Sequence, residues 1–489
     1  MLLEKVFANL GFDISTLENF EVKGISHESQ MIKPYDIYFC LTDDYNKACL
    51  RTEEAISNGA KLVFTNHNLP YENCRTVEDC RDLFARACAN FYERACDDLK
   101  IVGITGTNGK TTTSHLVCEM LKRNGKSVGV IGTNGVFYNG KTFPCPLTTP
   151  DADFLHKTFL DMKNAGVEYV VMEVSAHAID QKRINGIKFE LGVLTNITQD
   201  HLDYFKTFEA YEQTKFAFFS KKYIEMGIVC VDDKRARKML ENIEIPILTY
   251  GINSPSDVFA IDVCCSMNGS RFVGNVCDKI VEIKTNLIGQ YNIYNSLAAM
   301  AVCSCLGMKE DELVRGLNFV NPVEGRFNVI NFSGKYIVID FAHSPDGLMN
   351  VLKTAKTLTD KKVYVIFGCG GNRDKTKRPQ MGKIAEEYAD YVCLTDDNPR
   401  LENSQDIIAD IEKGMTKPHF VEQDRYQAIK KIIGIAQPGD IVLIAGKGAE
   451  KYQEIGTEKR PYNDFESVYN YFQESNPLRK KSGKEYYGC

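Results

Sequence analysis

Runs of hydrophobic residues, each followed by polar or glycine-rich residues, recur along the chain from about residue 100 onward. The clearest run covers residues 100–105, and candidate strands follow at residues 128–131, 169–174, 191–194 and 228–231. Short apolar runs with polar boundaries are typical of strands that are buried on both faces. We therefore predict a buried parallel sheet in the middle of the chain.

The pattern becomes more regular after residue 326. Apolar runs alternate with helix-like segments, and the runs lie at residues 336–339, 363–367, 391–394 and 441–444. This alternation predicts a parallel sheet in a compact, Rossmann-like C-terminal domain. Each run leads into a polar or glycine-rich loop, and such loops meet at the carboxyl edge of the sheet, where ligands bind. Strand-to-helix turns favour the same residue types, but four polar loops on one edge predict a binding site.

The length of 489 residues favours about three domains. An amphipathic, helix-like run at residues 78–94 closes the first region. We predict an α/β protein with an N-terminal domain over residues 1–97, a central domain over 98–326 built on a P-loop-type parallel sheet, and a C-terminal domain over 327–489. The basic tail at residues 479–489 lacks periodicity and is expected to fray.

Composition narrows the class of protein. The 59 basic and 65 acidic residues give a net charge of −6, which argues against binding to nucleic acid. No basic leader or apolar run of about 18–20 residues is present, so we expect neither secretion nor membrane insertion. The 17 cysteines are scattered without paired Cys-x-x-Cys spacing, which indicates a reducing cytoplasm rather than a zinc site.

A phosphate loop follows the first strand, and its residues are Gly106, Thr107, Asn108, Gly109, Lys110, Thr111 and Thr112. The glycines let successive amide groups face a phosphate, the lysine adds a positive charge, and the threonine hydroxyl can bind Mg²⁺. A helix predicted over residues 111–123 would direct its positive N-terminus at the same anion. The loop is shorter than the usual consensus, because Ile104 stands where its first glycine belongs. A plain strand–turn–helix is the alternative, and Gly-Lys-Thr-Thr in this context favours ATP binding.

The shortened loop resembles that of the Mur ligase family, the ATP-dependent, amide-forming enzymes of peptidoglycan precursor synthesis. Six further groups of residues carry the likeness in the same order along the chain: Thr148 to Pro150, Glu173 to His177, Asn196 to Asp203, Gly289 to Asn295, Gly325-Arg326 with Asp340 to Asp346, and Asp397 to Arg400. The resemblance is strongest to the member that extends UDP-N-acetylmuramoyl-L-alanyl-D-glutamate. It implies ATP and Mg²⁺ as cofactors, and we expect a monomer.

The resemblance also implies roles for single residues in forming and using an acyl phosphate. Lys110, Lys215, His201 and Arg326 would be catalytic. Thr111, Glu173, His201 and Lys215 would hold Mg²⁺, with Lys215 carbamylated on its side-chain nitrogen. Asn292, Arg326 and Asp340 would contact ATP together with the phosphate loop. Taken alone, His201 could be a structural histidine, Lys215 a solvated helix residue, Asn292 a helix cap and Arg326 a hinge ion pair.

Two further sets of residues match the family's substrate contacts. The set for the UDP-muramoyl-dipeptide is Ser29, Thr148, Thr149, Ser175, Gln181 and Arg183. The set for the incoming amino acid is Arg373, Asp397, Asn398, Pro399, Arg400, Gly446 and Glu450. An arginine at position 400 would bind the far carboxylate of meso-diaminopimelate in bidentate fashion, a group that lysine lacks.

The chain departs from the family pattern at three places. Glu28-Ser29-Gln30 stands where Asp-Ser-Arg is usual, Tyr35 replaces a glycine, and Ala449 replaces the histidine of Gly-Lys-Gly-His-Glu. These departures leave open a related ligase that adds L-lysine or ornithine, or one that acts in folate-type or specialised metabolism. A regulatory module without catalysis is a further alternative, and Lys110, Glu173, His201 and Lys215 together argue against it.

Overall fold

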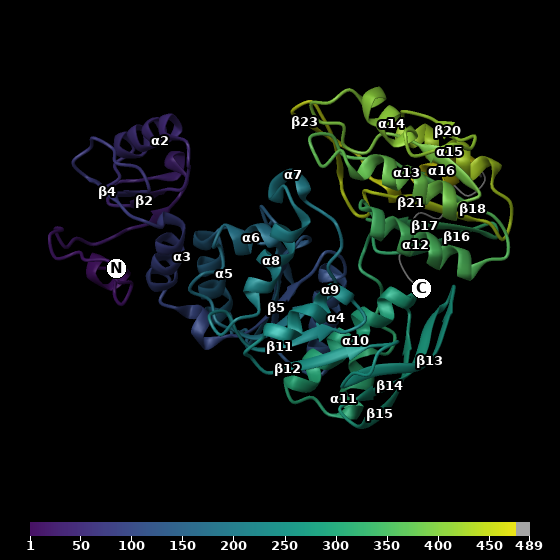
Figure 1. Cartoon of the computed structure of the whole chain (residues 1–489), viewed down its shortest axis with the longest axis horizontal. Helices are drawn as coiled ribbons and strands as arrows, with labels where there is room; N and C mark the ends of the chain where they lie inside the picture. The colour runs from purple at the N-terminus through teal and green to yellow at the C-terminus, as the bar shows by residue number, and fades with distance from the viewer. Residues whose placement is uncertain (476–489) are drawn as a thin grey trace.

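The computed structural model describes residues 1–475, and it confirms the α/β class with parallel sheets (Figure 1). The N-terminal part holds a parallel four-stranded sheet of β1 (Ile25–Ser26), β2 (Ile37–Cys40), β3 (Leu62–Thr65) and β4 (Cys74–Thr76). Alternate residues of these strands face opposite sides. Phe39 and Phe64 pack toward α1 (Leu3–Val6) and α3 (Cys80–Phe91), whereas Tyr38 and Val63 pack toward α2 (Tyr45–Ser57). The amphipathic run predicted at 78–94 is α3.

The middle of the chain forms an eleven-stranded sheet in the order β15-β14-β13-β12-β11-β10-β5-β9-β6-β7-β8. Its inner strands are parallel: β5 (Lys100–Thr105), β6 (Val128–Gly132), β9 (Tyr169–Glu173), β10 (Phe189–Leu194), β11 (Ile224–Cys230) and β12 (Ile247–Gly251). All five predicted strands lie among them. β13 (Val258–Ser266) continues parallel to β12, and antiparallel strands then complete both ends of the sheet: β14 (Gly269–Val276), β15 (Lys279–Thr285), β7 (Gly135–Tyr138) and β8 (Lys141–Phe143).

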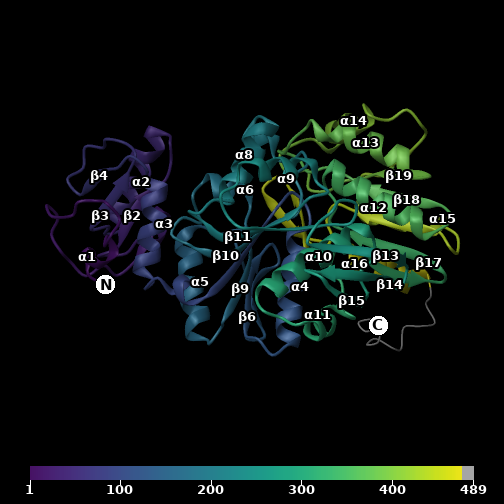
Figure 2. The same cartoon turned by 60° about the horizontal axis from the view of Figure 1, so that its bottom comes forward.

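Helices cover both faces of this sheet (Figure 2). On one face, Val102 and Ile104 of β5 pack with α4 (Lys110–Arg123), α10 (Gln290–Cys305) and α11 (Glu310–Leu317). On the other face, Ile101 packs with α5 (Ala152–Asn164), α6 (Ala176–Asp180) and α8 (Phe208–Phe218). Each fully buried aliphatic side chain contributes about 1.5–3 kcal/mol. This two-sided burial explains why the inner strands appear as continuous apolar runs in the sequence.

The C-terminal part holds a six-stranded sheet in the order β16-β17-β21-β18-β19-β20. Its bounds are β16 (Asn328–Phe332), β17 (Lys335–Asp340), β18 (Val363–Phe367), β19 (Tyr391–Leu394), β20 (Phe420–Val421) and β21 (Ile441–Ala445). Only the β16–β17 pair is antiparallel within this sheet, so the predicted parallel arrangement is confirmed. One face carries α12 (Pro345–Leu358), α13 (Lys377–Tyr388) and α14 (Ser404–Glu412), and the other carries α15 (Arg425–Ile435) and α16 (Asp464–Ser475). A hairpin of β22 (Tyr452–Ile455) and β23 (Glu458–Pro461) lies between β21 and α16 in the chain.

No helix within residues 1–475 is long and apolar enough to cross a membrane. The cysteines of the same residues are free thiols. The basic tail at residues 479–489 lies outside the described residues.

Candidate active site

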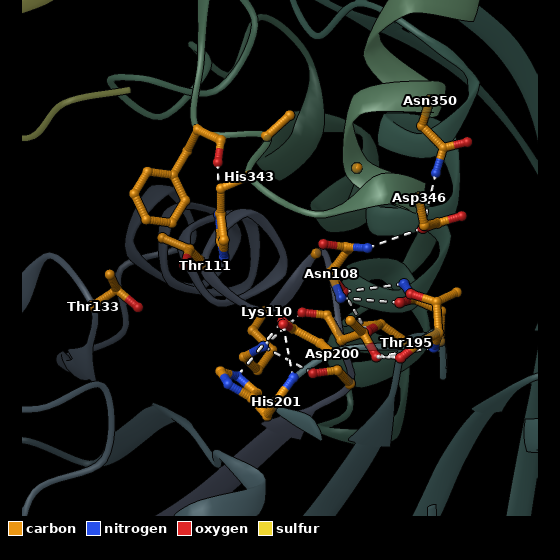
Figure 3. A pocket seen from close by; sticks show the side chains of 18 of the residues that line it. Asn108, Lys110, Thr111, Thr133, Thr195, Asp200, His201, His343, Asp346 and Asn350 are labelled. Atoms are coloured by element: carbon orange, nitrogen blue, oxygen red, sulfur yellow. Dashed lines mark hydrogen bonds and ion pairs between the residues drawn. The ribbon is translucent and has the colours of Figure 1, made fainter. Parts of the chain in front are cut away.

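A cleft of about 930 Å³ lies between the central sheet and the C-terminal domain (Figure 3). It is lined by residues that follow the carboxyl ends of strands on both sides, among them Gly106 after β5, Glu173 at the end of β9, Asp340 at the end of β17 and Gly368 after β18. The loops after β19 and β21 reach the same cleft. The four polar loops predicted at the edge of the C-terminal sheet therefore meet in one place.

The phosphate loop is held tightly by its neighbours in the central domain. Gly106 and Gly109 have φ angles of +143° and +88°, and a Cβ atom at these positions would collide with Thr195 and Asn295. The amide of Asn108 donates to Asn196 Oδ1 at 2.9 Å. Glycine at both positions is thus required by backbone conformation and by space. The loop leads directly into α4, whose N-terminus faces the cleft.

Two lysines meet at one carbonyl oxygen in this loop. Lys110 Nζ donates to Gly106 O at 2.8 Å and to Thr107 O at 2.9 Å, while Lys215 Nζ donates to Gly106 O at 3.0 Å. Lys215 is 1% exposed and lies over the Tyr211 ring. Burial lowers the pKa of both lysines, and the charge of Lys110 lowers that of Lys215 further. The Lys215 amine is therefore far more readily neutral than an ordinary lysine.

Glu173 is surrounded by hydroxyl groups. Thr111 Oγ1 and Thr133 Oγ1 donate to Glu173 Oε2 at 3.0 and 3.1 Å, and the Thr133 amide donates to Oε1 at 2.9 Å. A carboxylate and hydroxyls form the hard oxygen set that suits Mg²⁺. Within residues 1–475, no group of three or more His, Cys, Asp or Glu side chains is arranged to hold a metal ion. Any metal here would therefore rely on hydroxyl, water or substrate oxygens as well.

Asp200 and His201 lie on the same side of the loop as Lys110 (Figure 3). The His201 ring approaches Asp200 at 3.5 Å, and burial lowers the pKa of this histidine despite that carboxylate. Burial would raise the pKa of Asp200, but interactions with His201 foremost, and then with Lys377 and His343, hold it at about 2. Asp200 is thus a fixed negative charge.

Two hydrogen bonds join the phosphate loop to Arg326, at the boundary of the C-terminal domain, and to α12. Arg326 Nη2 donates to Thr111 Oγ1 at 3.3 Å, and its guanidinium lies 4.4 Å from the centre of the Phe341 ring. Asn108 Nδ2 donates to Asp346 at 2.9 Å across the cleft (Figure 3). Asp340 accepts the amides of residues 327 and 342 at 2.7 Å, and burial raises its pKa although Arg326 lies nearby.

The residues expected to contact the dipeptide are brought together around Thr149. Its hydroxyl donates to Glu173 O at 2.8 Å and accepts the Ser175 amide at 2.9 Å. Arg183 donates to Thr149 O at 2.8 Å and to Gln181 Oε1 at 2.5 Å. Thr148, Thr149, Ser175 and Arg183 line the cleft, whereas Gln181 lies just behind them.

The residues expected to contact the amino acid form a rigid network. Arg400 Nε donates to Glu454 at 2.8 Å, and its Nη1 donates to Gly371 O at 2.8 Å. Lys447 is fully buried and bonds both Asn398 and Glu450. This network places Arg373, Asp397, Asn398, Arg400, Gly446 and Glu450 on the cleft wall.

Two sequence families match the parts of the chain that form this cleft. The Mur ligase middle domain matches residues 104–303, and the Mur ligase glutamate ligase domain matches residues 325–448. The chain belongs to the Mur ligase family. It is 36% identical over 97% of its length to the UDP-N-acetylmuramoyl-L-alanyl-D-glutamate–2,6-diaminopimelate ligase of Caldanaerobacter subterraneus subsp. tengcongensis, all of which is covered. It is 37% identical over 96% of its length to the Clostridium perfringens enzyme of the same name, 99% of which is covered.

Solved structures of Mur ligases are similar to this one. A structure of a UDP-N-acetylmuramoyl-L-alanyl-D-glutamate–2,6-diaminopimelate ligase aligns with a TM-score of 0.70 at 30% identity and covers 97% of this chain and 99% of that one. MurF ligase from Thermotoga maritima in complex with ADP aligns with a TM-score of 0.65 at 21% identity, over 93% of this chain and 98% of that one. The second likeness shows the fold alone.

Some predicted residues of this Mur ligase lie away from the cleft. Ser29 is buried in the N-terminal domain and donates to Glu54 at 2.5 Å. The side-chain nitrogen Nδ2 of Asn292 donates to Ile288 O, just before α10, at 2.8 Å, whereas Asn295 does line the cleft. Pro399 is also absent from the cleft wall, which its neighbours on either side reach.

Several cleft or supporting residues of this Mur ligase were not predicted, among them Thr133, Thr195, Asp346 and Glu454. The first three lie in polar turns or at the start of a helix, and Thr133 and Thr195 come just after the predicted strands at residues 128–131 and 191–194. Glu454 carries no such signal, because its pairing with Arg400 depends on a contact across 54 residues.

Proposed function

We propose that this Mur ligase joins meso-diaminopimelate to UDP-N-acetylmuramoyl-L-alanyl-D-glutamate, with hydrolysis of ATP to ADP and phosphate, in peptidoglycan precursor synthesis. The observation that carries the proposal is the arrangement of Arg400 in the same cleft as the phosphate loop. The names of full-length relatives at 36–37% identity support the same substrates.

The reaction has two steps. An oxygen of the glutamyl carboxylate attacks the γ-phosphorus of ATP, the bond to ADP breaks, and an acyl phosphate forms. The amine of the incoming amino acid then attacks the acyl carbon, phosphate leaves, and the amine loses a proton. Both steps bring negative groups together, so positive charges fixed before binding lower the barrier. Lys110, Arg326 and the loop amides supply those charges.

Mg²⁺ would supply charge neutralisation between the phosphates and the carboxylate. Glu173 and Thr111 would hold one ion, and His201 with Lys215 would support a second near the reacting carboxylate. Lys215 has no carboxylate partner among residues 1–475, and its lowered pKa favours the neutral amine that reacts with carbon dioxide to give a carbamate and a proton. The carbamate would replace a buried cation with an anionic oxygen ligand.

Arg400 offers a specificity test for the amino acid. Glu454 and Gly371 hold two edges of its guanidinium, which leaves the third for a ligand. A carboxylate at the far end of meso-diaminopimelate would bind there in charge-assisted fashion. Asp397, whose buried Oδ2 accepts no hydrogen bond from the described part of the chain, would complement an ammonium group of the same substrate.

The three domains would divide the substrates among them. Residues 1–97 would bind the UDP end, 98–326 the ATP and dipeptide, and 327–489 the amino acid. We also propose that the enzyme acts as a monomer in the cytoplasm, and sedimentation of the active enzyme tests its oligomeric state.

The second candidate function is the same ligation with a different incoming amino acid. Ala449 lies in the loop of Gly446 and Glu450, and its backbone packs against Gly325 at the start of the C-terminal domain. A change in this loop could select L-lysine or ornithine in place of meso-diaminopimelate.

One assay separates these possibilities. Purified enzyme with ATP, Mg²⁺ and UDP-N-acetylmuramoyl-L-alanyl-D-glutamate is given meso-diaminopimelate, L-lysine or L-ornithine, and phosphate release and product mass are followed. We expect fastest turnover with meso-diaminopimelate. Faster turnover with lysine would contradict the role of Arg400, and no turnover with any of the three would contradict the function itself.

A further inference from the structure

Asp151 occupies the N-cap position of α5 but does not cap the helix. Its φ and ψ angles of −71° and 162° are those of a normal N-cap, yet its carboxylate accepts no hydrogen bond from the first turn. By contrast, Asp79 and Asp424 in the same position each accept an amide of their own helix. An aspartate cap stabilises a helix by about 1 kcal/mol. The Asp151 carboxylate gives up this interaction because it faces two other groups.

The first of these groups is Arg183. Asp151 Oδ1 lies 3.1 Å from Arg183 Nε, an ion pair in which Nε does not reach hydrogen-bond geometry, while the other guanidinium nitrogens donate to Thr149 O and Gln181 Oε1. Two hydrogen bonds and one ion pair thus hold the guanidinium. Arg183 lines the cleft, but Asp151 is not part of the cleft wall. Asp151 can therefore act on a substrate only through Arg183.

The second group is His27, which comes from the N-terminal domain. Its ring nitrogens lie 3.7 Å from Asp151 and 3.3 Å from Asp153, and its ring packs 5.5 Å from that of Phe84. Burial alone would lower the pKa of His27, but Asp153 and Asp151 together raise it above its ordinary value. His27 directly precedes Glu28-Ser29-Gln30, the segment that departs from the family pattern.

We propose that Asp151 is a positioning residue for the muramoyl-dipeptide site, which orients Arg183 and is itself held by His27 across the domain boundary. This inference rests on the proposed function and adds a link within it. The contact of His27 with Asp151 would then influence how Arg183 is oriented, and Arg183 belongs to the set expected to bind the peptide end of the same substrate. A bidentate arginine binds a carboxylate well only when its plane is fixed.

A second ion pair across the same boundary provides a matched control. Lys182, next to Arg183, pairs with Asp79 at the start of α3. Asp79→Asn removes this ion pair and retains a side chain that can cap α3, and Asp151→Asn is the same substitution at the N-cap position of α5. The control therefore removes one interdomain charge contact without touching the Arg183 guanidinium.

The experiment measures KM for each substrate, and the affinity for UDP-N-acetylmuramoyl-L-alanyl-D-glutamate by calorimetry, in wild type, Asp151→Asn, Asp151→Glu, His27→Gln and Asp79→Asn. For Asp151→Asn we expect the KM for this substrate to rise on the order of tenfold, with the KM for ATP unchanged, since supporting partners of a binding group have effects of this size. His27→Gln should shift the same KM by less, Asp151→Glu should restore part of it, and Asp79→Asn should leave it within about twofold.

Three outcomes would overturn the inference. Equal effects of Asp79→Asn and Asp151→Asn would mean that only domain attachment matters. An Asp151→Asn variant that raises every KM and lowers the melting temperature would indicate a purely structural role, and one that binds the substrate like wild type would remove the role altogether. A wild-type enzyme that neither binds nor converts the substrate would instead overturn the proposed function, and this inference with it.

Discussion

The two ends of the cleft differ in whether their cations form ion pairs with carboxylates of the protein. At the activation end, which we define as Lys110, Lys215, Arg326 and Glu173, none of the three cations forms an ion pair with a carboxylate of residues 1–475. At the recognition end, which we define as Arg400 on the cleft wall, Arg378 and Lys447 outside that wall, and their partners, each of these three cations is already bound to a carboxylate.

The difference follows from what each end does. Cations without protein partners are costly to bury, and they are retained where an anionic ligand compensates them during the reaction. Paired cations cost less and hold a fixed shape, which suits selection of one amino acid among several. We expect changes at the activation end to reduce the rate, and changes at the recognition end to alter substrate preference or stability.

The largest effect should come from Lys110. Lys110→Met removes a fixed charge from the phosphate loop, and we expect kcat/KM to fall on the order of 10³-fold, the loss typical of a key transition-state contact. Phosphate release with all substrates present measures it. An unchanged melting temperature would exclude unfolding, and a loss below about tenfold would contradict the contrast between the two ends.

Lys215 should come next. Lys215→Ala removes the proposed carbamate, and we expect a loss of roughly 10²-fold or more that added bicarbonate or a short carboxylate partly restores. The matched control is the same variant with chloride at equal ionic strength. Activity equal to wild type would remove Lys215 from the site.

Arg400 should change preference more than rate. Arg400→Met removes one charge-assisted contact of about 1.5–3 kcal/mol, so the KM for meso-diaminopimelate should rise roughly 10–100-fold. The KM for ATP should stay constant, and the relative use of L-lysine should increase. A parallel rise in the KM for ATP would show that Arg400 belongs to the activation end.

The smallest effect concerns stability at the recognition end. Glu402 binds the buried Arg378, and chiefly this arginine lowers its pKa from the ordinary 4.5 to about 2. A lowered folded-state pKa contributes stability above pH 4.5 that is lost as the pH falls toward 2. We expect Glu402→Gln to lower the free energy of unfolding by about 1–2 kcal/mol at pH 7. Denaturant titrations should show the difference shrinking below pH 4.5, and a constant difference would contradict the ion pair.

The sequence allowed the inner strands and the phosphate loop to be predicted because both are local patterns. Strands such as β9 and β18 are buried on both faces and therefore stand out as apolar runs. The antiparallel extension β13–β15 alternates buried and exposed residues, and the N-terminal strands are short, so neither was predicted.

The site residues, too, could be predicted only where they belong to a local sequence pattern. Glu173 could be proposed from its position at a strand end, but the hydroxyl of Thr133 beside it belongs to a turn 40 residues earlier. Asn292 matches a sequence motif, yet its side chain is used within α10. Contacts between distant segments, such as Arg400 with Glu454, are decided by tertiary packing and have no local signature.

The transfer of oxygen between substrates tests the central claim most directly. UDP-N-acetylmuramoyl-L-alanyl-D-glutamate labelled with ¹⁸O in the glutamyl carboxylate is converted with ATP and meso-diaminopimelate, and the released phosphate is examined by ³¹P NMR. An acyl phosphate requires the bond between carbon and the bridging oxygen to break, so the account predicts phosphate that carries ¹⁸O from the carboxylate. Unlabelled phosphate released together with the amide product would contradict it.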